Sequence, residues 1–316
     1  SAFFGCYSNI NVYSPLIFLF SQSPFMKKMY LCKIRFSRLN TFSVLKNGKN
    51  MQDANYKMMK TNKQLIGIDL FAGAGGLSLG AEMAGISMRY AVEADAYAAA
   101  SYKRNFKNAT VFCEDIRKLS ADKLNTQPVF IIMGGPPCQG FSLSNTKTRD
   151  MSNPNNRMFE EFLRFVDKIA PTWFVFENVY GLTKFKNGEE NIQNHIENRF
   201  RDIGYTVKSK ILYASDFGVP QRRNRLFIVG NRNGIDFEFP KEFDYSVSVD
   251  EAISDLPVLG NGEIQMKGEY TVPFEQASPY AQLMRKKSKA PTQNIVSRNK
   301  DYVVERYKYI GQGENW

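Results

Sequence analysis

Residues 64–83 have the sequence QLIGIDLFAGAGGLSLGAEM, and this stretch decides the fold class. The apolar run Leu65–Phe71 has the length of a strand, and Gly76–Met83, after the glycines, has the pattern of a helix. Glycines at such a turn let the backbone approach a ligand, and the amides at the helix start favour a polar or anionic group. In the dinucleotide pattern GxGxxG the third glycine would fall at Ser78, which disfavours NAD and FAD.

The alternation of strands and helices continues to Val229. The other expected strands are 88–93, 110–112, 129–133, 173–177, 206–212 and 226–229, and the other expected helices are 94–105, 157–169 and 191–203. Alternating units of this kind predict an α/β fold with a doubly wound, mostly parallel sheet of seven strands. After about Phe239 the pattern loosens into a short helix at Asp250–Leu256 and polar segments, which predicts the start of a smaller, irregular domain.

The positive charge of the chain is concentrated near its N-terminus. The protein has 316 residues and a net charge of +11, but residues 1–64 hold ten Lys or Arg and one acid, so the rest carries only +2. Nucleic-acid binding therefore has to be argued from a site and not from total charge. Residues 1–63 lack periodicity and are expected to be a basic N-terminal extension, either an arm that touches phosphates or, as we favour, disordered or non-native sequence.

The cysteine and histidine counts exclude several kinds of site. Four cysteines without CxxC spacing do not indicate a disulfide scaffold, and they favour a reducing compartment, the cytoplasm. A single histidine, His195, excludes Cys2His2 zinc sites and HExxH helices, so we expect no metal. The early apolar run Leu16–Phe20 is far shorter than the roughly 20 residues that a membrane span needs, so we expect no membrane association.

Two acids follow the next expected strands. Glu93 ends the second strand, where an acid can bind ribose hydroxyls, and Asp115 follows the third, where a carboxylate can accept from an adenine amino group. With the glycine turn they predict a nucleoside cofactor without a pyrophosphate, such as S-adenosylmethionine. Asp115 could equally cap the N-terminus of a helix.

The loop after the fourth strand, Gly134–Ser142, has the sequence GGPPCQGFS. Its prolines and glycines predict a rigid, exposed backbone around one thiol, so Cys138 is the candidate nucleophile. A free thiol has a pKa near about 8.5, so the site must lower this pKa or accept the proton. Cys113, within an apolar strand, is expected to be a small core residue instead.

With these motifs in order, residues 64–229 resemble the cytosine carbon-5 DNA methyltransferases of the bacterial modification type. The resemblance rests on Asp69–Gly80, Glu93, Asp115, Gly134–Ser142, Glu177-Asn178-Val179 and Gln221-Arg222-Arg223-Asn224-Arg225. It implies the sheet of the S-adenosylmethionine-dependent methyltransferases, a catalytic and cofactor-binding domain at 64–236 and an incomplete target-recognition region at 237–316. The family's closing Gly-Asn-Ser/Ala-Val segment is not found, so we expect a chain truncated at its C-terminus.

The resemblance also implies the chemistry. The family adds a cysteine thiolate to carbon 6 of a cytosine in DNA, transfers a methyl group to carbon 5 and then eliminates the cysteine, and Cys138 occupies that place. Glu177 would protonate or hydrogen-bond ring nitrogen N3, Arg225 would hold the carbonyl oxygen, and Arg223 would stabilise the site. Because the reaction needs an extruded base, residues 143–156 are expected to close over a flipped cytosine.

The remaining site residues are likewise implied by the resemblance. The cofactor-binding residues would be Asp69, Phe71, Ala72, Gly73, Gly75, Gly76, Glu93, Ala94, Asp115, Ile116 and Pro136. The residues that bind the substrate base would be Gln139, Ser142, Asn178 and Val179. Phe71 would stack near the adenine, whereas Ala94 stands where some relatives have an aromatic residue.

The resemblance implies double-stranded DNA as the partner and S-adenosyl-L-methionine as the cofactor, in a restriction-modification context. Two alternatives stay open: the same chemistry on tRNA, and a catalytically silent fragment or a subunit of a split methyltransferase. Further partners would be a cognate restriction endonuclease or a complementary subunit, and we expect a monomer. The DNA recognition sequence does not follow from the chain, because specificity needs base-edge contacts from a recognition region.

Overall fold

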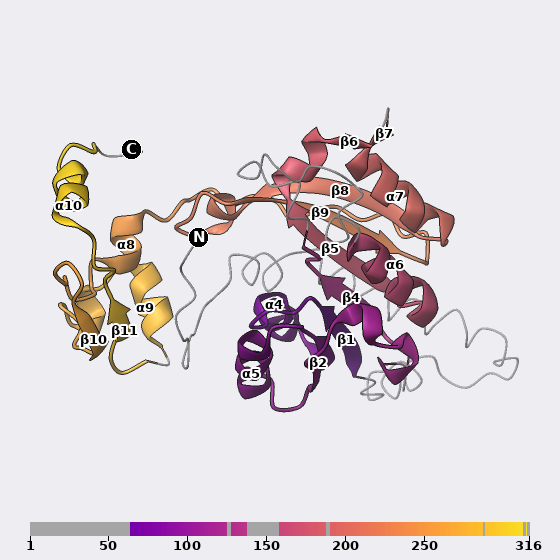
Figure 1. The fold of residues 1–316 in the computed structure, drawn as a ribbon, viewed down its shortest axis with the longest axis horizontal. Coiled ribbons are helices and arrows are strands. Elements are labelled where there is room, and N and C mark those ends of the chain that lie inside the picture. Colours follow the sequence, from indigo (N-terminus) through magenta and orange to yellow (C-terminus); the bar gives the residue numbers. More distant parts are fainter. Residues whose placement is uncertain are drawn as a thin grey trace, which may run out of the picture. The chain divides into compact units, whose positions relative to one another are not determined.

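The computed structural model describes residues 64–124, 128–137, 158–187, 190–286, 288–311 and 314. The chain divides into two compact units, of which the first ends at Asp244 and the second begins at Tyr245. All described candidate site residues lie in the first unit, so each unit is described by itself (Figure 1).

A seven-stranded sheet forms the first unit, with the strand order β3-β2-β1-β4-β5-β9-β8 (Figure 1). Its strands are β1 Leu65–Leu70, β2 Ile86–Val92, β3 Thr110–Phe112, β4 Ile131–Gly134, β5 Trp173–Val179, β8 Thr206–Tyr213 and β9 Asn224–Asn231. Strands β1 to β5 pair in parallel, whereas β9 runs antiparallel to both β5 and β8. The predicted doubly wound, mostly parallel, seven-stranded sheet is confirmed, and each strand overlaps its expected range.

Helices cover both faces of this sheet. They are α4 Gly76–Met83, α5 Ala96–Asn105, α6 Met158–Ile169 and α7 Ile192–Asp202. The short elements of the unit are η1 Ile116–Lys118, η2 Ala121–Leu124, η5 Tyr180–Lys184, β6 Lys186–Asn187, β7 Glu190–Asn191 and η6 Ala214–Phe217. Side chains of α6 and α7 join one buried cluster with the sheet, and α4 contributes to another. Because apolar groups meet both faces, β1 and β4 are buried along their whole length.

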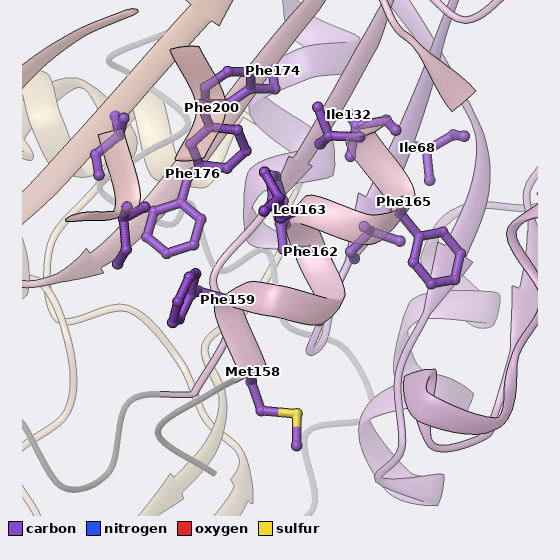
Figure 2. Close-up of a cluster of buried hydrophobic side chains, with 14 of the residues drawn as sticks. Ile68, Ile132, Met158, Phe159, Phe162, Leu163, Phe165, Phe174, Phe176 and Phe200 are labelled. Carbon is purple, nitrogen blue, oxygen red and sulfur yellow. The ribbon is translucent and has the colours of Figure 1, made fainter. Parts of the chain in front are cut away.

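Helix α6 supplies much of the core on its side of the sheet. Its buried side chains recur at three- and four-residue spacing: Met158, Phe159, Phe162, Leu163, Phe165, Val166 and Ile169. The ring of Phe162 lies 5.4 Å from that of Phe176 in β5, and Phe174 of β5 stacks on Phe200 of α7 at 4.0 Å between ring centroids (Figure 2). These contacts fix β5, the strand that carries Glu177, on a closely packed base.

The first unit continues past β9, because the segment that follows it carries buried aromatic side chains. Phe237 is buried, and Phe239 and Phe243 pack against the same cluster. The ring of Phe237 lies 5.5 Å from that of Trp173 in β5. The structure therefore divides the chain after Asp244, and the assignment of the later residues to target recognition stays a prediction.

The expectation that Cys113 is a core residue is wrong. Cys113 is exposed, because the edge strand β3 ends at Phe112 and the chain leaves the sheet there. His195 on α7 is half-buried, with its ring edge-on to that of Phe159 at 5.9 Å between centroids and its Nδ1 3.0 Å from the Glu190 carboxylate. Neither side chain lies among the candidate site residues described below.

The second unit contains short elements: α8 Val249–Ile253, β10 Ile264–Lys267, η7 Phe274–Gln276, α9 Pro279–Arg285, β11 Thr292–Ile295 and α10 Asp301–Tyr307. In its described part the buried apolar side chains are Ala277, Ala281 and Pro291. Arg285 occupies its interior, with the guanidinium 3.9 Å from the ring centroid of Tyr270 and Nη1 3.4 Å from the buried carboxylate of Asp255. Across the described ranges of both units, no helix is long and apolar enough to cross a membrane.

Candidate active site

The described candidate residues gather at one edge of the sheet. In order along the chain they are Phe71–Gly75 after β1, Glu93 after β2, Asp115 after β3, Gly135 and Pro136 after β4, Glu177–Val179 at the end of β5, and Arg223 and Arg225 at the start of β9. The carboxyl ends of β1 to β5 share this edge because the strands are parallel, and β9 begins here because it runs antiparallel. Ligands of open α/β sheets bind at the carboxyl edge.

The turn Phe71–Gly75, named here the glycine loop, has a constrained backbone. Phe71, Gly73 and Gly75 have positive φ values of 58°, 54° and 96°. This region is costly for a residue with a Cβ atom, so the conformation of Phe71 must be held by its surroundings. Gly75 also lacks space, since a Cβ there would lie 2.3 Å from Cε2 of Phe106. Only glycine fits at this point.

Glu93 closes the glycine loop. One carboxylate oxygen accepts from the amide of Gly73 at 2.7 Å, and the other accepts from the amide of Asp95 at 2.8 Å. Asp95 in turn caps α5, because its side chain accepts from the amide of Ala98. Each carboxylate oxygen has a second lone pair, so Glu93 can also accept hydrogen bonds from the hydroxyls of a ligand.

Asp69 lies beneath the glycine loop and is fully buried. Ser78 Oγ donates to its Oδ2 at 2.5 Å, and Ser78 Oγ lies 2.6 Å from the hydroxyl of Tyr102. No donor among the described residues reaches the other oxygen, Oδ1. Burial raises the pKa of Asp69 to about 7, although the hydrogen bond from Ser78 opposes the shift. The carboxyl group is therefore poised to change its charge near neutral pH.

Asp115 caps a helix, which is the alternative that the sequence left open. Its side chain accepts from the amide of Arg117 at the start of η1, and Arg117 Nε lies 2.9 Å and 3.0 Å from the two carboxylate oxygens. The hydrogen bonds from Arg117 lower the pKa of Asp115 to about 2. This carboxylate is ionised under all physiological conditions, and its neighbour Ile116 is buried.

A second group of site residues surrounds Glu177. Glu177 Oε1 lies 2.9 Å from Nε of Arg225, and both side chains are mostly buried. The pair is diagonal across the antiparallel strands, because Glu177 lies opposite Phe227 and Arg225 lies opposite Val179. Burial raises the pKa of Glu177, while Arg225 and then Arg223 act in the opposite direction. A carboxyl group in this setting can exchange a proton with a bound ring nitrogen.

The segment after β4 is tied to the end of β5. The side chain of Asn178 donates to the carbonyl oxygen of Pro136 at 3.1 Å. A Cβ on Gly135 would lie 2.8 Å from Oε2 of Glu177, so glycine permits this close approach. Burial, with Arg225 adding repulsion, lowers the pKa of Arg223. The site thus combines one carboxyl group with two guanidinium groups beside the backbone that leads to position 138.

Three predicted residues, Cys138, Gln139 and Ser142, lie outside the described residues, as does the expected closing loop 143–156. Of the predicted cofactor residues, Ala72 and Pro136 are buried, whereas Ala94 is exposed. Within the described ranges, no group of three or more His, Cys, Asp or Glu side chains could hold a metal ion.

Sequence reasoning missed Ser78, Tyr102 and Arg117. The spacing of Tyr102 and Ala99, the two buried residues of α5, was the available signal, because both fall on one side of the expected helix. Ser78 was noted only as a departure from a glycine pattern, and its hydroxyl between two buried polar groups depends on tertiary packing.

Comparison with known proteins gives consistent matches. A family model described as C-5 cytosine-specific DNA methylase matches residues 65–314. The Type II methyltransferase M.DdeI of Desulfomicrobium norvegicum is 38% identical over 259 residues, covering 78% of this chain and 61% of that protein. The Type II methyltransferase M.XorII of Xanthomonas oryzae pv. oryzae is 37% identical over 236 residues, covering 72% of this chain and 55% of that protein.

Solved structures agree in fold. A crystal structure of a protein assigned as a DNA modification methyltransferase encoded within a prophage (E. coli) matches with a TM-score of 0.62 and 29% identity, covering 79% of this chain and 77% of that one. Spodoptera frugiperda DNMT2 matches with a TM-score of 0.51 and 19% identity, covering 79% and 80%, which supports the fold alone.

The matches cover most of this chain but only part of the length of the curated relatives. The chain spans 61% and 55% of the length of the two curated relatives. The family model covers residues 65–314, which include both described units and all the described site residues. The chain therefore belongs to the C-5 cytosine-specific DNA methylase family.

Proposed function

We propose that this protein transfers a methyl group from S-adenosyl-L-methionine to carbon 5 of cytosine in double-stranded DNA, through a covalent adduct of Cys138 with a flipped base. The observation that carries the proposal is the mostly buried pair of Glu177 and Arg225, which lies beside Gly135 and Pro136 in the segment leading to Cys138. A methylase that attacks carbon 6 needs a nucleophile and groups that neutralise charge on the ring. Cys138 would be the nucleophile, and Glu177 and Arg225 would neutralise the charge.

The residues at the carboxyl ends of β1 to β3 fit S-adenosylmethionine. The glycine loop can approach a ligand closely because Gly73 and Gly75 carry no side chain, and Glu93 can accept from ribose hydroxyls. Asp115 can accept from the adenine amino group, and Ile116 supplies an apolar neighbour. When bound, this cofactor supplies the methyl group on a sulfonium sulfur.

The protein's own residues control the ring of the cytosine. The thiolate of Cys138 forms a bond to carbon 6, and Glu177 gives a proton or a hydrogen bond to N3, so that the electron pair displaced toward the ring is not left as a full negative charge. Arg225, held by Glu177, binds the carbonyl oxygen of the base, and Arg223 adds positive charge nearby. After the methyl group has bonded to carbon 5, the proton of carbon 5 leaves to water or a weak base, Cys138 is eliminated and N3 returns its proton to Glu177.

The raised pKa of Glu177 suits this role. Its burial favours the protonated form more strongly than Arg225 and Arg223 favour the carboxylate, so the net shift of the pKa is upward. A proton donor works best when its pKa lies near the working pH. Asn178 and Val179, together with Gln139 and Ser142, would contact the flipped base.

The wider setting follows from the same proposal. Residues 64–244 would form the catalytic domain and 245–316 the beginning of the target-recognition region, with Phe71, Ala72, Gly76, Ala94 and Pro136 completing the cofactor site and Asp69 supporting it from beneath the glycine loop. The protein would act as a monomer in the cytoplasm, with a cognate restriction endonuclease or a complementary subunit as further partners.

A trapping experiment tests the function. Duplex DNA containing 5-fluorocytosine blocks loss of the group at carbon 5, so a Cys138 adduct should accumulate as a covalent band when S-adenosylmethionine is present. Genomic DNA and total RNA serve as parallel substrates for methyl transfer. Cys138→Ser is the matched variant and should give no adduct, with methyl transfer reduced to background. Methylation of RNA without methylation of DNA would show that RNA is the substrate. An adduct that still forms in Cys138→Ser would show that Cys138 is not the nucleophile.

A further inference from the structure

Tyr102 of α5 touches the glycine loop and the helix that follows it. Its hydroxyl lies 2.6 Å from Oγ of Ser78 in the first turn of α4. Its ring packs against Gly75, where an added Cβ would lie 3.0 Å from Cδ2 of Tyr102. Tyr102 is fully buried, so it meets the loop from inside the protein and not from the ligand side.

The hydroxyl of Tyr102 begins a short relay of hydrogen bonds. Ser78 has one hydroxyl hydrogen and donates it to Asp69 at 2.5 Å, so the bond between Ser78 and Tyr102 takes its hydrogen from Tyr102. Burial holds the pKa of Tyr102 above its ordinary value, so the phenol keeps this hydrogen. The relay joins α5, α4 and β1, and the glycine loop connects the last two of these elements.

The same helix also holds the middle of the loop. Glu93 accepts from Gly73 and from Asp95, and Asp95 caps the start of α5. Helix α5 therefore fixes the loop near Gly73 through its cap and at Gly75 through Tyr102. The two anchors lie on opposite ends of one rigid element, which is how a turn with several positive φ values can keep a single conformation.

We propose that Tyr102 is a positioning residue for cofactor binding, which fixes the glycine loop through Gly75 and through the relay to Ser78 and Asp69. It acts without touching the cofactor. This inference rests on the proposed function, because the glycine loop is the proposed binding segment for S-adenosylmethionine.

The test compares two variants in which a buried tyrosine loses its hydroxyl group. Tyr102→Phe removes the relay hydroxyl and keeps the ring against Gly75. Tyr205→Phe is the matched control, because Tyr205 is also buried and donates its hydroxyl to the carbonyl oxygen of Pro171 at 2.7 Å, away from the loop. Both variants of the full chain are measured by amide hydrogen exchange, read at residues 72–80, and by calorimetric titration with S-adenosylmethionine and S-adenosylhomocysteine, well below the unfolding temperature.

Tyr102→Phe should speed exchange at residues 72–80 by about 2- to 10-fold, the range expected for one lost hydrogen bond, and should weaken both ligands by a similar factor. Both ligands respond alike because the loop, and not the methyl group, is affected. Tyr205→Phe should lower the melting temperature to a similar extent and leave loop exchange and both affinities at wild-type values.

A third variant tests whether the relay acts as one unit. Ser78→Ala removes the middle hydroxyl, so adding Tyr102→Phe to it should change loop exchange no further. Unchanged loop exchange in Tyr102→Phe, equal acceleration in Tyr205→Phe, or unchanged affinity in Tyr102→Phe would each overturn the positioning role. If the wild-type chain does not bind S-adenosylmethionine, the proposed function loses its cofactor, and the exchange comparison still decides whether Tyr102 fixes the loop.

Discussion

Asp69 and Glu177 are buried carboxyl groups at the same edge of one sheet, but their partners differ. Asp69 at the end of β1 meets the hydroxyl of Ser78, and one of its oxygens has no donor among the described residues. Glu177 on β5 meets the guanidinium of Arg225 at 2.9 Å, with Arg223 nearby. The first carboxyl group is held by neutral donors without a compensating charge, whereas the second belongs to a charge pair.

This difference separates two tasks. A neutral relay around Asp69 fixes backbone geometry beneath the glycine loop, because hydroxyl groups impose direction and add no charge. The charged pair around Glu177 can respond to charge that develops on a bound ring, since arginine donors are already oriented in a mostly buried site. A substitution that keeps the shape of the side chain but removes its charge or its proton should therefore have different effects at the two residues. At Glu177 it should change the rate of methyl transfer, and at Asp69 it should change the pH dependence of stability.

Glu177→Gln should give the largest effect. Glutamine keeps the size and can accept from Arg225, but it cannot exchange a proton with the base, so kcat for methyl transfer should fall by about 10²- to 10⁴-fold. Affinity for S-adenosylmethionine should stay within about 2-fold of wild type, because the cofactor residues are untouched. Single-turnover methyl transfer and calorimetric titration measure the two quantities.

Glu197→Gln is the control for losing a buried glutamate. Glu197 accepts from Arg201 at 2.6 Å and from Ser209 on the α7 side of the sheet, outside the site. Its variant should lower stability and leave kcat near the wild-type value. Equal losses of kcat in both variants would show that Glu177 acts through stability and would end its assignment as a proton donor.

Asp69→Asn should change the pH dependence of stability. The folded protein keeps a proton on Asp69 up to about pH 7, whereas the unfolded chain releases it near the ordinary pKa of 3.8. The folded state binds more protons between these values, so this group makes stability fall as pH rises from about 4 to about 7. Relative to the variant, the wild type should lose up to about 4 kcal/mol of unfolding free energy across this window.

Denaturant titrations at several pH values measure this effect through tryptophan fluorescence, to which Trp173, buried in the first unit, contributes. The difference between the two proteins cancels the titration of other carboxyl groups that they share. Parallel curves for wild type and Asp69→Asn would mean that Asp69 is ionised throughout the window, and Asp69 would then resemble Glu177 in needing a positive partner.

The secondary structure of the first unit could be predicted from the sequence, but most contacts within the site could not. The strands appear as continuous apolar runs because both faces of the sheet are buried. Ile132 and Met133, for example, are adjacent in β4 and lie in different buried clusters. Glu177 and Arg225 could be grouped from motif order, yet their diagonal contact depends on the antiparallel register of β5 and β9. The Ser78–Tyr102 relay could not be predicted, because it joins helices whose packing no local pattern encodes.

Asp115 extends the comparison to a partly exposed carboxylate, and Asp115→Ser should give the smallest effect. Serine caps helices about as well as aspartate, so the free energy of unfolding should stay within about 0.5 kcal/mol of wild type, since the surface pair with Arg117 contributes little. A shorter side chain cannot reach an adenine amino group, so affinity for S-adenosylmethionine should fall by about 3- to 10-fold.

Asp115→Ala is the control, because it removes both the helix cap and the acceptor. It should lower the free energy of unfolding by about 1 kcal/mol more than Asp115→Ser and cause the same loss of affinity. Wild-type affinity in Asp115→Ser would show that Asp115 acts only as a helix cap. Glu93 would then be the one described carboxylate of the cofactor site that can accept hydrogen bonds from the ligand, because Asp69 is enclosed beneath the loop.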